Sequence, residues 1–479
     1  MKKTDYEVIV GLEVHAELKT ASKIFCSCST AFGASPNTQC CPVCVGLPGG
    51  LPVLNRRAVE LAVRAGLALG CHISGHSRFD RKQYFYPDLP KAYQVTQNDR
   101  PLCRDGALTV QTSRGERTVG ITRIHLEEDA GKLIHQGDKT FVDCNRCGIP
   151  LIEIVSAPDI RSGEEAVAYL RTLRNILVTC GVSDCKMEEG SMRCDVNLSV
   201  RRVGSSDFGV RTEIKNINSF SFTEKAIAYE AERQMKLLEA GEPILLETRR
   251  YDPDLDQTLP MRKKEVSEDY RYLREPNLPM LCLTEQEIAT IRSSLPELPD
   301  ARAARLCRQY GLTAYDASVL TSDFALADYF EEAATHTAFP KLLVNLLLTE
   351  LLRHCKGDPF GCPVAAHRLG ALAGLLGEGR INSSIAKKLL IRLTKEDFDP
   401  DRVAEQEQLT LIRDERLLRE TVQAVIAENP QAVADYRGGR TAALRALQGA
   451  LMARTGGRAD PVLAQRLLTE LLDHTKAEA

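Results

Sequence analysis

Four segments in the first half of the chain alternate apolar and polar side chains, the pattern of β-strands that bury one face. Their sequences are YEVIVGLEVHAEL, RTVGITRIHLE, CDVNLSVRR and GVRTEIKNI. Glycine- and proline-rich pieces separate them, as in GLPGGLPV and YPDLPKAY. The pattern predicts a sheet with one buried face, and it constrains the fold more than any other feature of the sequence.

Two longer segments predict helices. One follows Ser162, a candidate N-cap, carries Glu164 and Glu165 in its first turn, and stops at Gly181. The other is TEKAIAYEAERQMKLLEAG, which stops at Gly241. Helices combined with alternating strands indicate a domain of mixed α and β structure.

The chain has 479 residues, enough for two to four domains. We predict an α+β protein whose first domain, residues 1–295, has an antiparallel-rich sheet. The linker SSLPELPD follows, where Pro296 and Pro299 break any helix. DFALADYFEEAA and FPKLLVNLLLTELLRHC then read as amphipathic helices, so residues 296–409 are predicted to be all-helical. Residues 410–479 are predicted to form a small helical tail domain.

Two cysteine pairs have the spacing of a metal knuckle: Cys26-x-Cys28, and twelve residues later Cys41-x2-Cys44. Zinc binds four thiolates tetrahedrally, and each short turn offers two sulfurs from one side. The pairs therefore predict a structural zinc site with no position left open for a substrate. Cys40 is an alternative ligand in place of Cys41. The alternative interpretation of the whole pattern is four reduced thiols that bind no metal.

The other cysteines give weaker signals. Cys144-x2-Cys147 is a second short pair, but no partner pair is visible for it. The start, MKKTDYEVIV, lacks the apolar stretch and cleavage site of a secretory signal, and no run of eighteen apolar residues exists. We therefore expect a cytoplasmic protein without a membrane span, in which a disulfide framework is not expected.

Acidic residues recur in the strand-like segments. They are Glu13 beside His15, the run Glu127, Glu128 and Asp129, then Asp195 near Asn197, and Glu213. Residues two apart on a strand share a face, so Glu13 and His15 point the same way. Acids gathered from several strands would repel one another, and a divalent cation with oxygen ligands, Mg²⁺ above all, relieves this. The alternative is that each acid faces solvent.

One stretch, RFDRKQYFYPDLPKAYQ, combines basic and aromatic residues that suit a nucleotide. It contains Lys82, Tyr84, Tyr86, Asp88, Lys91 and Tyr93. Lysine neutralises phosphate charge and a tyrosine ring stacks on a base, although a surface loop with buried aromatics is an equal alternative. No P-loop and no strand-coupled G-x-G-x-x-G motif is present. Any ATP would therefore be held by Mg²⁺ and lysines.

The net charge is −3, so any nucleic-acid site must be a local patch. The tail supplies one candidate, a run of arginines without an intervening acid. They are Arg437, Arg440, Arg445, Arg454 and Arg458. The alternative is that these arginines are ordinary solvated residues on helix surfaces.

Together these segments resemble the B subunits of aspartyl/glutamyl-tRNA amidotransferases. The matching stretches include SKIFCSCSTAFGASPNTQCCPVCVGLPGGLPVLN, RKQYFYPDLPKAYQ, HLEEDAGK, NRCGIPLIEIVSAPD, MRCDVNLSV and RTEIKNINSF. The match is colinear over essentially the whole chain. The sister E subunit of archaea has a large insertion, for which this chain has no room. One departure is Cys144, where many relatives carry an aromatic residue.

The resemblance implies an N-terminal cradle domain, residues 1–295, that holds a kinase site, and a tail domain that contacts tRNA. It implies zinc on Cys26, Cys28, Cys41 and Cys44. It also implies Mg²⁺ near Glu13, His15, Glu128 and Glu213, with Asp195 close by. Lys82, Tyr84, Tyr86 and Lys91 would then face ATP. His15 would bind either the metal or ammonia.

The resemblance further implies a heterotrimer with an amidase A subunit and a small C subunit. Such a ligase uses glutamine as its amide donor. On this subunit, ATP would phosphorylate the side-chain carboxylate of Glu-tRNA(Gln) or Asp-tRNA(Asn), and ammonia would displace the phosphate. Which tRNA is used stays open. Two other interpretations are a non-catalytic tRNA-binding scaffold with a zinc knuckle and an independent metal-dependent hydrolase.

Overall fold

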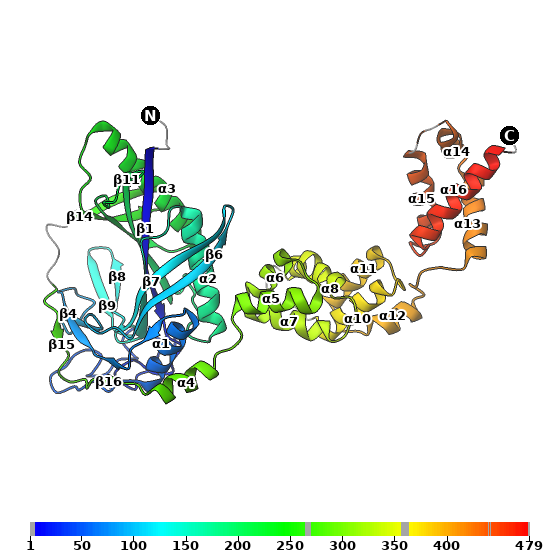
Figure 1. Ribbon diagram of the computed structural model, residues 1–479. Coiled ribbons are helices and arrows are strands. Elements are labelled where there is room, and N and C mark those ends of the chain that lie inside the picture. The colour runs from blue at the N-terminus through cyan, green and yellow to red at the C-terminus, as the bar shows by residue number, and fades with distance from the viewer. Residues whose placement is uncertain (1–4, 264–269, 356–363, 439, 441, 478–479) are drawn as a thin grey trace. The chain divides into compact units, whose positions relative to one another are not determined.

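The computed structural model describes residues 5–263, 270–355, 364–438, 440 and 442–477 (Figure 1). Contacts within the chain divide it into two units, Met1–Pro299 and Asp300–Ala479. Within the described residues, no helix has both the length and the apolar character needed to cross a lipid bilayer.

The first unit is built on a nine-stranded sheet with the order β14-β13-β12-β11-β1-β10-β7-β6-β2. Its strands are β1 (Tyr6–Glu17), β2 (His72–Ile73), β6 (Cys103–Thr112), β7 (Gly115–Glu128), β10 (Pro150–Ser156), β11 (Met192–Arg202), β12 (Thr212–Ile217), β13 (Glu247–Asp252) and β14 (Gln257–Lys263). Every neighbouring pair is antiparallel except β12 and β13, which are parallel. The predicted α+β class with an antiparallel-rich sheet is confirmed.

Among the described residues of this unit, three small sheets and four helices accompany the large sheet. The small sheets are β15 (Leu273–Arg274) with β4 (Asp80–Gln83) and β5 (Tyr93–Thr96), β16 (Leu281–Cys282) with β3 (His76–Ser77), and β8 (Lys132–Gln136) with β9 (Lys139–Asp143). The helices are α1 (Arg56–Ala68), α2 (Gly163–Thr179), α3 (Phe220–Ala240) and α4 (Glu285–Ser293).

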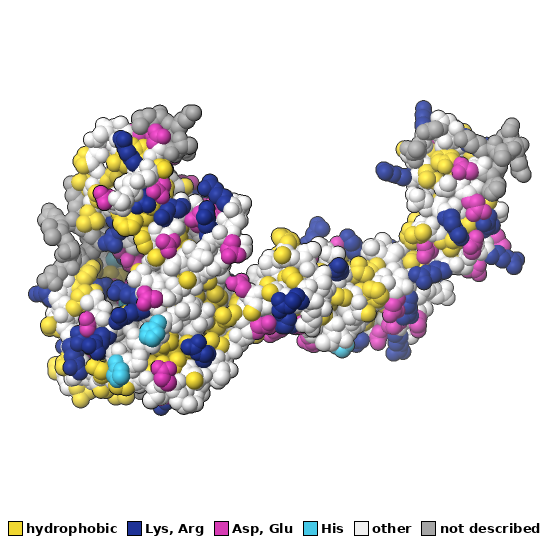
Figure 2. All heavy atoms as spheres, in the orientation of Figure 1, with side chains coloured by type: hydrophobic (Ala, Val, Ile, Leu, Met, Phe, Trp, Pro, Cys, Tyr) yellow, Lys and Arg dark blue, Asp and Glu magenta, His cyan; other side chains and the backbone are white. Residues whose placement is uncertain are grey.

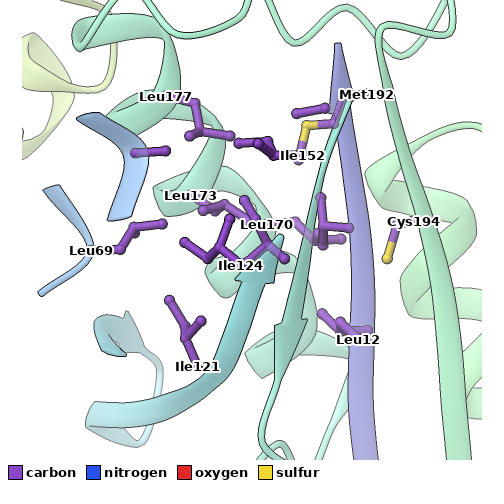
Figure 3. Close-up of a cluster of buried hydrophobic side chains, with 14 of the residues drawn as sticks. Leu12, Leu69, Ile121, Ile124, Ile152, Leu170, Leu173, Leu177, Met192 and Cys194 are labelled. Atoms are coloured by element: carbon purple, nitrogen blue, oxygen red, sulfur yellow. The ribbon is translucent and has the colours of Figure 1, made fainter. Parts of the chain in front are cut away.

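The core lies between one face of the large sheet and helices α1, α2 and α3. Alternate residues of the central strand β1, such as Leu12 and Val14, are fully buried there. Figure 3 shows Leu170, Leu173 and Leu177 of α2 facing the apolar side chains of the strands. Because successive strand residues point to opposite faces, the residues between these apolar ones lie on the other face of the sheet.

The two helices predicted in this unit are confirmed, as are the predicted N-cap Ser162 and the glycines at their C-terminal ends, but α3 begins at Phe220, before the predicted segment. The Ser162 side chain accepts a hydrogen bond from the Glu165 backbone N–H at the start of α2, and Gly181 follows the helix with φ +64°. Ser219 caps α3 in the same way, and Gly241 ends it in the left-handed conformation.

The second unit is helical in its described residues. Its helices are α5 (Pro299–Tyr310), α6 (Ala314–Thr321), α7 (Phe324–Ala334), α8 (Pro340–Asn345), α9 (Leu352–His354), α10 (Ala366–Gly377), α11 (Ser383–Leu393), α12 (Pro400–Gln406), α13 (Glu415–Glu428), α14 (Pro430–Arg437), α15 (Ala442–Arg454) and α16 (Pro461–Ala477). Two separate hydrophobic clusters form, one within residues 306–404 and one within 418–472. The division into three domains at 295 and 409 stays a prediction.

One predicted helix, FPKLLVNLLLTELLRHC, is interrupted. Between α8 and α9 lies a π-helical segment, Leu346–Leu351. Within it, the Thr349 hydroxyl donates a hydrogen bond to the Asn345 carbonyl, 2.6 Å away. Such a bond competes for a carbonyl that the backbone of an α-helix would use, and periodicity does not reveal it.

Candidate active site and metal sites

A cavity of about 800 Å³ lies on the face of the large sheet opposite the helices. Antiparallel register explains which side chains line it. On β1, Glu13 lies opposite Asp195 of β11, and His15 lies opposite Glu153 of β10. Glu153 in turn lies opposite His125 of β7. Directly opposed residues share a face, so the pairing of the strands brings these five polar side chains together.

The first acidic group consists of Glu13, Asp195 and Glu213, which each offer a carboxylate oxygen within 4.8 Å of the others. The Lys215 ammonium lies 2.7 Å from Asp195 Oδ2 and 3.0 Å from Glu213 Oε1. Asn197 donates a hydrogen bond to Glu13. Burial, followed by the neighbouring carboxylates, raises the pKa of Glu13. One lysine therefore does not neutralise the group, and a bound cation would complete the neutralisation.

The second group consists of His15, Glu127 and Glu153, whose potential ligand atoms also lie within 4.8 Å of one another. His15 Nε2 is 3.5 Å from Glu127 Oε1 and 3.6 Å from Glu153 Oε2. Behind it, His125 Nε2 is 3.3 Å from Glu153 Oε2. Burial lowers the pKa of His125, but Glu153 and Glu127 raise it more, to about 9. His125 thus holds the carboxylate of Glu153 in place.

Glu128, which we expected in this acidic site, lies elsewhere. It follows Glu127 on β7 and therefore points to the opposite face, as Leu126 does. There the Lys91 ammonium contacts its carboxylate at 2.6 Å, and the Val95 backbone N–H donates to it at 2.8 Å. Glu128 and Lys91 line a separate small cavity of about 130 Å³. Glu127 occupies the position that we had assigned to its neighbour.

The residues predicted to contact the nucleotide are also divided between the two cavities. Lys82, Tyr84 and Tyr86 line the large cavity, but Lys91 does not, because it is paired with Glu128. Of the expected site residues, the structure brings Glu13, His15, Asp195 and Glu213 together with these three.

Sequence reasoning missed several residues of the cavity. They include Arg123, His125, Glu153, Arg211, Lys215, Thr248, Tyr270 and Tyr272. Glu153 carries the same signal as Glu13, an acid at the polar position of an apolar strand in PLIEIVS, and could have been found. Arg211 precedes β12 without any pattern that marks it.

The four knuckle cysteines meet in space. The sulfurs of Cys26, Cys28, Cys41 and Cys44 all lie within 4.8 Å of one another. Cys41 Sγ and Cys44 Sγ are 3.9 Å apart, and a zinc–sulfur bond of about 2.3 Å gives a tetrahedral edge of about 3.8 Å. Cys40 instead donates to a backbone carbonyl of its own loop at 3.2 Å. The four thiols therefore suit one tetrahedral zinc ion.

A buried lysine adjoins these cysteines. Lys23 is fully buried, with its ammonium 3.6 Å from Cys44 Sγ and 3.2 Å from the Cys144 carbonyl. Among the described residues, no carboxylate forms an ion pair with it. Hydrogen bonding from Cys26 lowers the pKa of the Cys44 thiol. A buried ammonium beside thiolates fits an anionic metal–thiolate centre.

Cys144 and Cys147 do not belong to this cluster. Cys147 is buried, and its thiol lies 3.8 Å from the Asp88 carbonyl. Among the described residues, neither cysteine falls in any group of three or more metal-ligating side chains.

Comparison with known proteins identifies the family of this chain. A family model described as the GatB/GatE catalytic domain matches residues 8–289, and one described as the GatB domain matches residues 328–472. The B subunit of the aspartyl/glutamyl-tRNA(Asn/Gln) amidotransferase of Carboxydothermus hydrogenoformans is 49% identical over 98% of this chain and 99% of its own length. The corresponding B subunits of Caldanaerobacter subterraneus and Geobacillus kaustophilus are each 50% identical, over 98% and 97% of this chain and 99% of their own lengths. The chain therefore belongs to the GatB/GatE family of amidotransferase subunits.

Proposed function

We propose that this chain is the B subunit of a glutamine-dependent tRNA amidotransferase, a ligase. It uses ATP to phosphorylate the side-chain carboxylate of Glu-tRNA(Gln), Asp-tRNA(Asn) or both. Ammonia then displaces phosphate and gives Gln-tRNA or Asn-tRNA. The observation that carries the proposal is the pair of acidic groups side by side in one cavity of about 800 Å³. That volume lies in the usual range for small-molecule sites.

The donor atoms fit Mg²⁺. Five carboxylates and one imidazole make up the two groups, and hard oxygen ligands are those that Mg²⁺ prefers. Glu13, Asp195 and Glu213 would hold one ion, and His15, Glu127 and Glu153 the other. When bound, Mg²⁺ would neutralise negative charge on the phosphates as the phosphoryl group is transferred.

The chain's own cations complete the site for a nucleotide. Lys82, Arg123 and Arg211 line the cavity and supply positive charge for phosphate oxygens. Lys215 bridges Asp195 and Glu213, and this fixes their orientation. These side chains act by binding and positioning, because phosphoryl transfer to a carboxylate requires no protein nucleophile.

The carboxylate of the substrate needs this activation because its anion is a poor electrophile. Its oxygen attacks the γ-phosphorus of ATP, and ADP leaves with the electrons of the broken bond. Ammonia then forms the carbon–nitrogen bond, inorganic phosphate leaves, and one proton passes to solvent or a nearby base. An amidase A subunit would supply the ammonia, and a small C subunit would complete the heterotrimer in the cytoplasm.

Two further parts of the chain have supporting roles in this proposal. The four knuckle cysteines bind a structural Zn²⁺. The tail domain binds the body of the tRNA through its exposed arginines, which Figure 2 shows interspersed with acidic side chains over the C-terminal helices. A non-catalytic zinc scaffold would not need two acidic groups inside a large cavity.

The test uses the purified heterotrimer with Glu-tRNA, Mg²⁺ and ATP labelled in the γ-phosphate, without glutamine. We expect ADP release and a labelled acyl phosphate that depend on the aminoacyl group. Glu153→Gln should reduce the rate at least 100-fold, in the range expected for loss of a group that stabilises the transition state. Glu7→Gln is the matched control, because Glu7 lies on β1 but pairs with Arg201 outside the cavity. Transfer at the wild-type rate in Glu153→Gln would contradict the proposal.

A further inference from the structure

Four tyrosine rings form a continuous row on one wall of the large cavity. Ring centroids are 6.0 Å apart for Tyr86 and Tyr84, 5.9 Å for Tyr84 and Tyr270, and 6.0 Å for Tyr270 and Tyr272. The Lys82 ammonium lies 5.5 Å from the centre of the Tyr84 ring and 4.7 Å from that of Tyr270. All five side chains line the cavity. Two of the four rings, Tyr270 and Tyr272, belong to a segment in which the sequence shows no recognisable motif.

The small sheet fixes that segment against β4. The Gln83 backbone N–H donates to the Tyr270 carbonyl at 3.0 Å, and β15 pairs with β4 immediately afterwards. Arg81 of β4 holds the buried carboxylate of Glu275 with two hydrogen bonds, of 2.6 and 3.1 Å. Arg271, between Tyr270 and Tyr272, has a left-handed backbone with φ +42°, and the two tyrosine rings on either side of it lie next to each other on the cavity wall. The rings are therefore held by main-chain pairing and a buried ion pair.

Rings arranged in this way suit a flat aromatic ligand. Tyr86 is 49% exposed and Tyr272 38%, so ring surface is available on both ends of the row. Every nucleobase has a π-face, and stacking on aromatic side chains is the usual means of holding an unpaired base. The Lys82 ammonium beside the two central rings gives this wall a positive charge, which favours a ligand that carries an anionic phosphate as well as a base. No base within a duplex could reach this wall, because its faces are already stacked.

We propose that Tyr270 and Tyr272 complete an aromatic subsite that stacks on an unpaired adenine base. The inference rests on the proposed function, which brings two such bases to this cavity: that of ATP and that of the terminal adenosine of the aminoacyl-tRNA. Both share one chemistry, a purine ring followed by an anionic phosphate. Tyr270 and Tyr272 are thus substrate-binding residues additional to Lys82, Tyr84 and Tyr86.

The chain has no tryptophan, so one introduced indole reports on its own surroundings. The variant Tyr272→Trp keeps an aromatic face at the wall, and a stacked base quenches indole fluorescence. The probes are Mg²⁺–ATP, and a hairpin RNA ending in CCA compared with one that lacks the terminal adenosine. Phe85→Trp is the matched control, because Phe85 is 73% exposed and is not part of the cavity wall. We expect saturable quenching in Tyr272→Trp alone.

Affinity gives the second measurement on the full chain. Tyr270→Leu and Tyr272→Leu should weaken binding of one probe by about 5- to 150-fold, the range for the loss of one stacking contact, whereas Tyr→Phe at either position should retain affinity. If the leucine variants lose affinity for ATP alone, the subsite binds the base of ATP. If they lose affinity for the CCA-ended RNA alone, the subsite binds the tRNA terminus. Circular dichroism confirms that each variant is folded.

The inference would be overturned if the indole fluorescence of Tyr272→Trp were not quenched and both leucine variants bound both probes with wild-type affinity. That result leaves acyl-phosphate formation by the wild-type heterotrimer untouched, so it differs from failure of the proposed function. Conversely, quenching without any acyl phosphate would leave the base-stacking subsite standing and remove the kinase assignment.

Discussion

Glu127 and Glu128 are neighbours in the chain but lie on opposite faces of β7, and this decides their roles. We predict that Glu127→Gln weakens Mg²⁺ binding on the order of 10- to 100-fold, because it removes one carboxylate from the second acidic group. Glu128→Gln should leave Mg²⁺ affinity within about threefold, since its carboxylate contacts Lys91 instead. Competition between Mn²⁺ and Mg²⁺, followed by electron paramagnetic resonance, measures both. Equal losses in the two variants would refute the assignment.

The knuckle gives a second prediction at the scale of single residues. Cys28→Ser removes one of four thiolates, so the purified chain should lose its zinc, which wild type should hold at about one ion per chain. Cys40→Ser changes the adjacent thiol that lies outside the cluster and should keep its zinc. Elemental analysis of both proteins settles the matter. Zinc lost from Cys40→Ser as well would show the alternative set of ligands, in which Cys40 replaces Cys41.

At this scale, the sequence predicted those candidate ligands that follow a fixed local spacing. Two short cysteine turns and the pair Glu13 and His15 are local patterns. The structure brings the four cysteines into one cluster, and it places Glu13 and His15 in two separate acidic groups that line one cavity. Which of Glu127 and Glu128 points into the cavity depends on which face of β7 is turned toward it. Two successive acidic residues do not reveal this, because they point to opposite faces. Tyr270 and Tyr272 reach the site through pairing with a segment nearly two hundred residues earlier, a contact that no local pattern encodes.

Among the elements, helix α3 and strands β13 and β14 share a buried ionic network. Glu230 is fully buried and accepts hydrogen bonds from Arg233 at 2.7 Å, Gln234 at 2.9 Å and Thr258 at 2.8 Å. Burial raises the pKa of Glu230, but these hydrogen bonds lower it more, to below the ordinary value of 4.5. The network fixes β13, whose Thr248 donates to Glu213 in the cavity.

We predict that Glu230→Gln lowers the free energy of unfolding at neutral pH by about 1–3 kcal/mol. Because the folded-state pKa is below the unfolded one, the ionised carboxylate contributes fully above the unfolded pKa, and its contribution is lost as pH falls through the folded value. The difference between variant and wild type should therefore shrink in acid. Urea unfolding at pH 7 and at about pH 3.5 measures it.

The neighbouring exposed residue provides the control. Glu232 lies on the same helix, is largely exposed and pairs with Lys236, so Glu232→Gln should change stability by less than about 0.5 kcal/mol at either pH. A deficit in Glu230→Gln that is equal at both pH values would contradict the role assigned to its charge.

Elements were predicted best where their signals are local. The alternating pattern predicted strands β1, β7, β11 and β12, and cap residues predicted both ends of α2 and the C-terminal end of α3. The short strands β4, β5 and β15 carry too few residues to show a period, and their existence depends on pairing across the chain. The same holds for the order of strands in the large sheet.

At the scale of the whole molecule, the tail is predicted to hold tRNA by charge. Arg437 and Arg445 are exposed. Replacing both with glutamine should weaken tRNA binding and make the plot of log affinity against log salt shallower by about 1 to 2, because each phosphate contact releases counterions. Lys225→Gln with Lys236→Gln, on α3, is the charge-matched control. Filter binding across a salt series measures the slopes, and equal slopes in both double variants would contradict a tail-specific role.

The central claim is that two acidic groups on one sheet face each hold a divalent ion. Anomalous diffraction from crystals of the chain soaked in Mn²⁺ tests it most directly. The account predicts one peak among His15, Glu127 and Glu153, and a second among Glu13, Asp195 and Glu213, each displaced by excess Mg²⁺. Peaks absent from both groups, or present only beside Glu128, would contradict it.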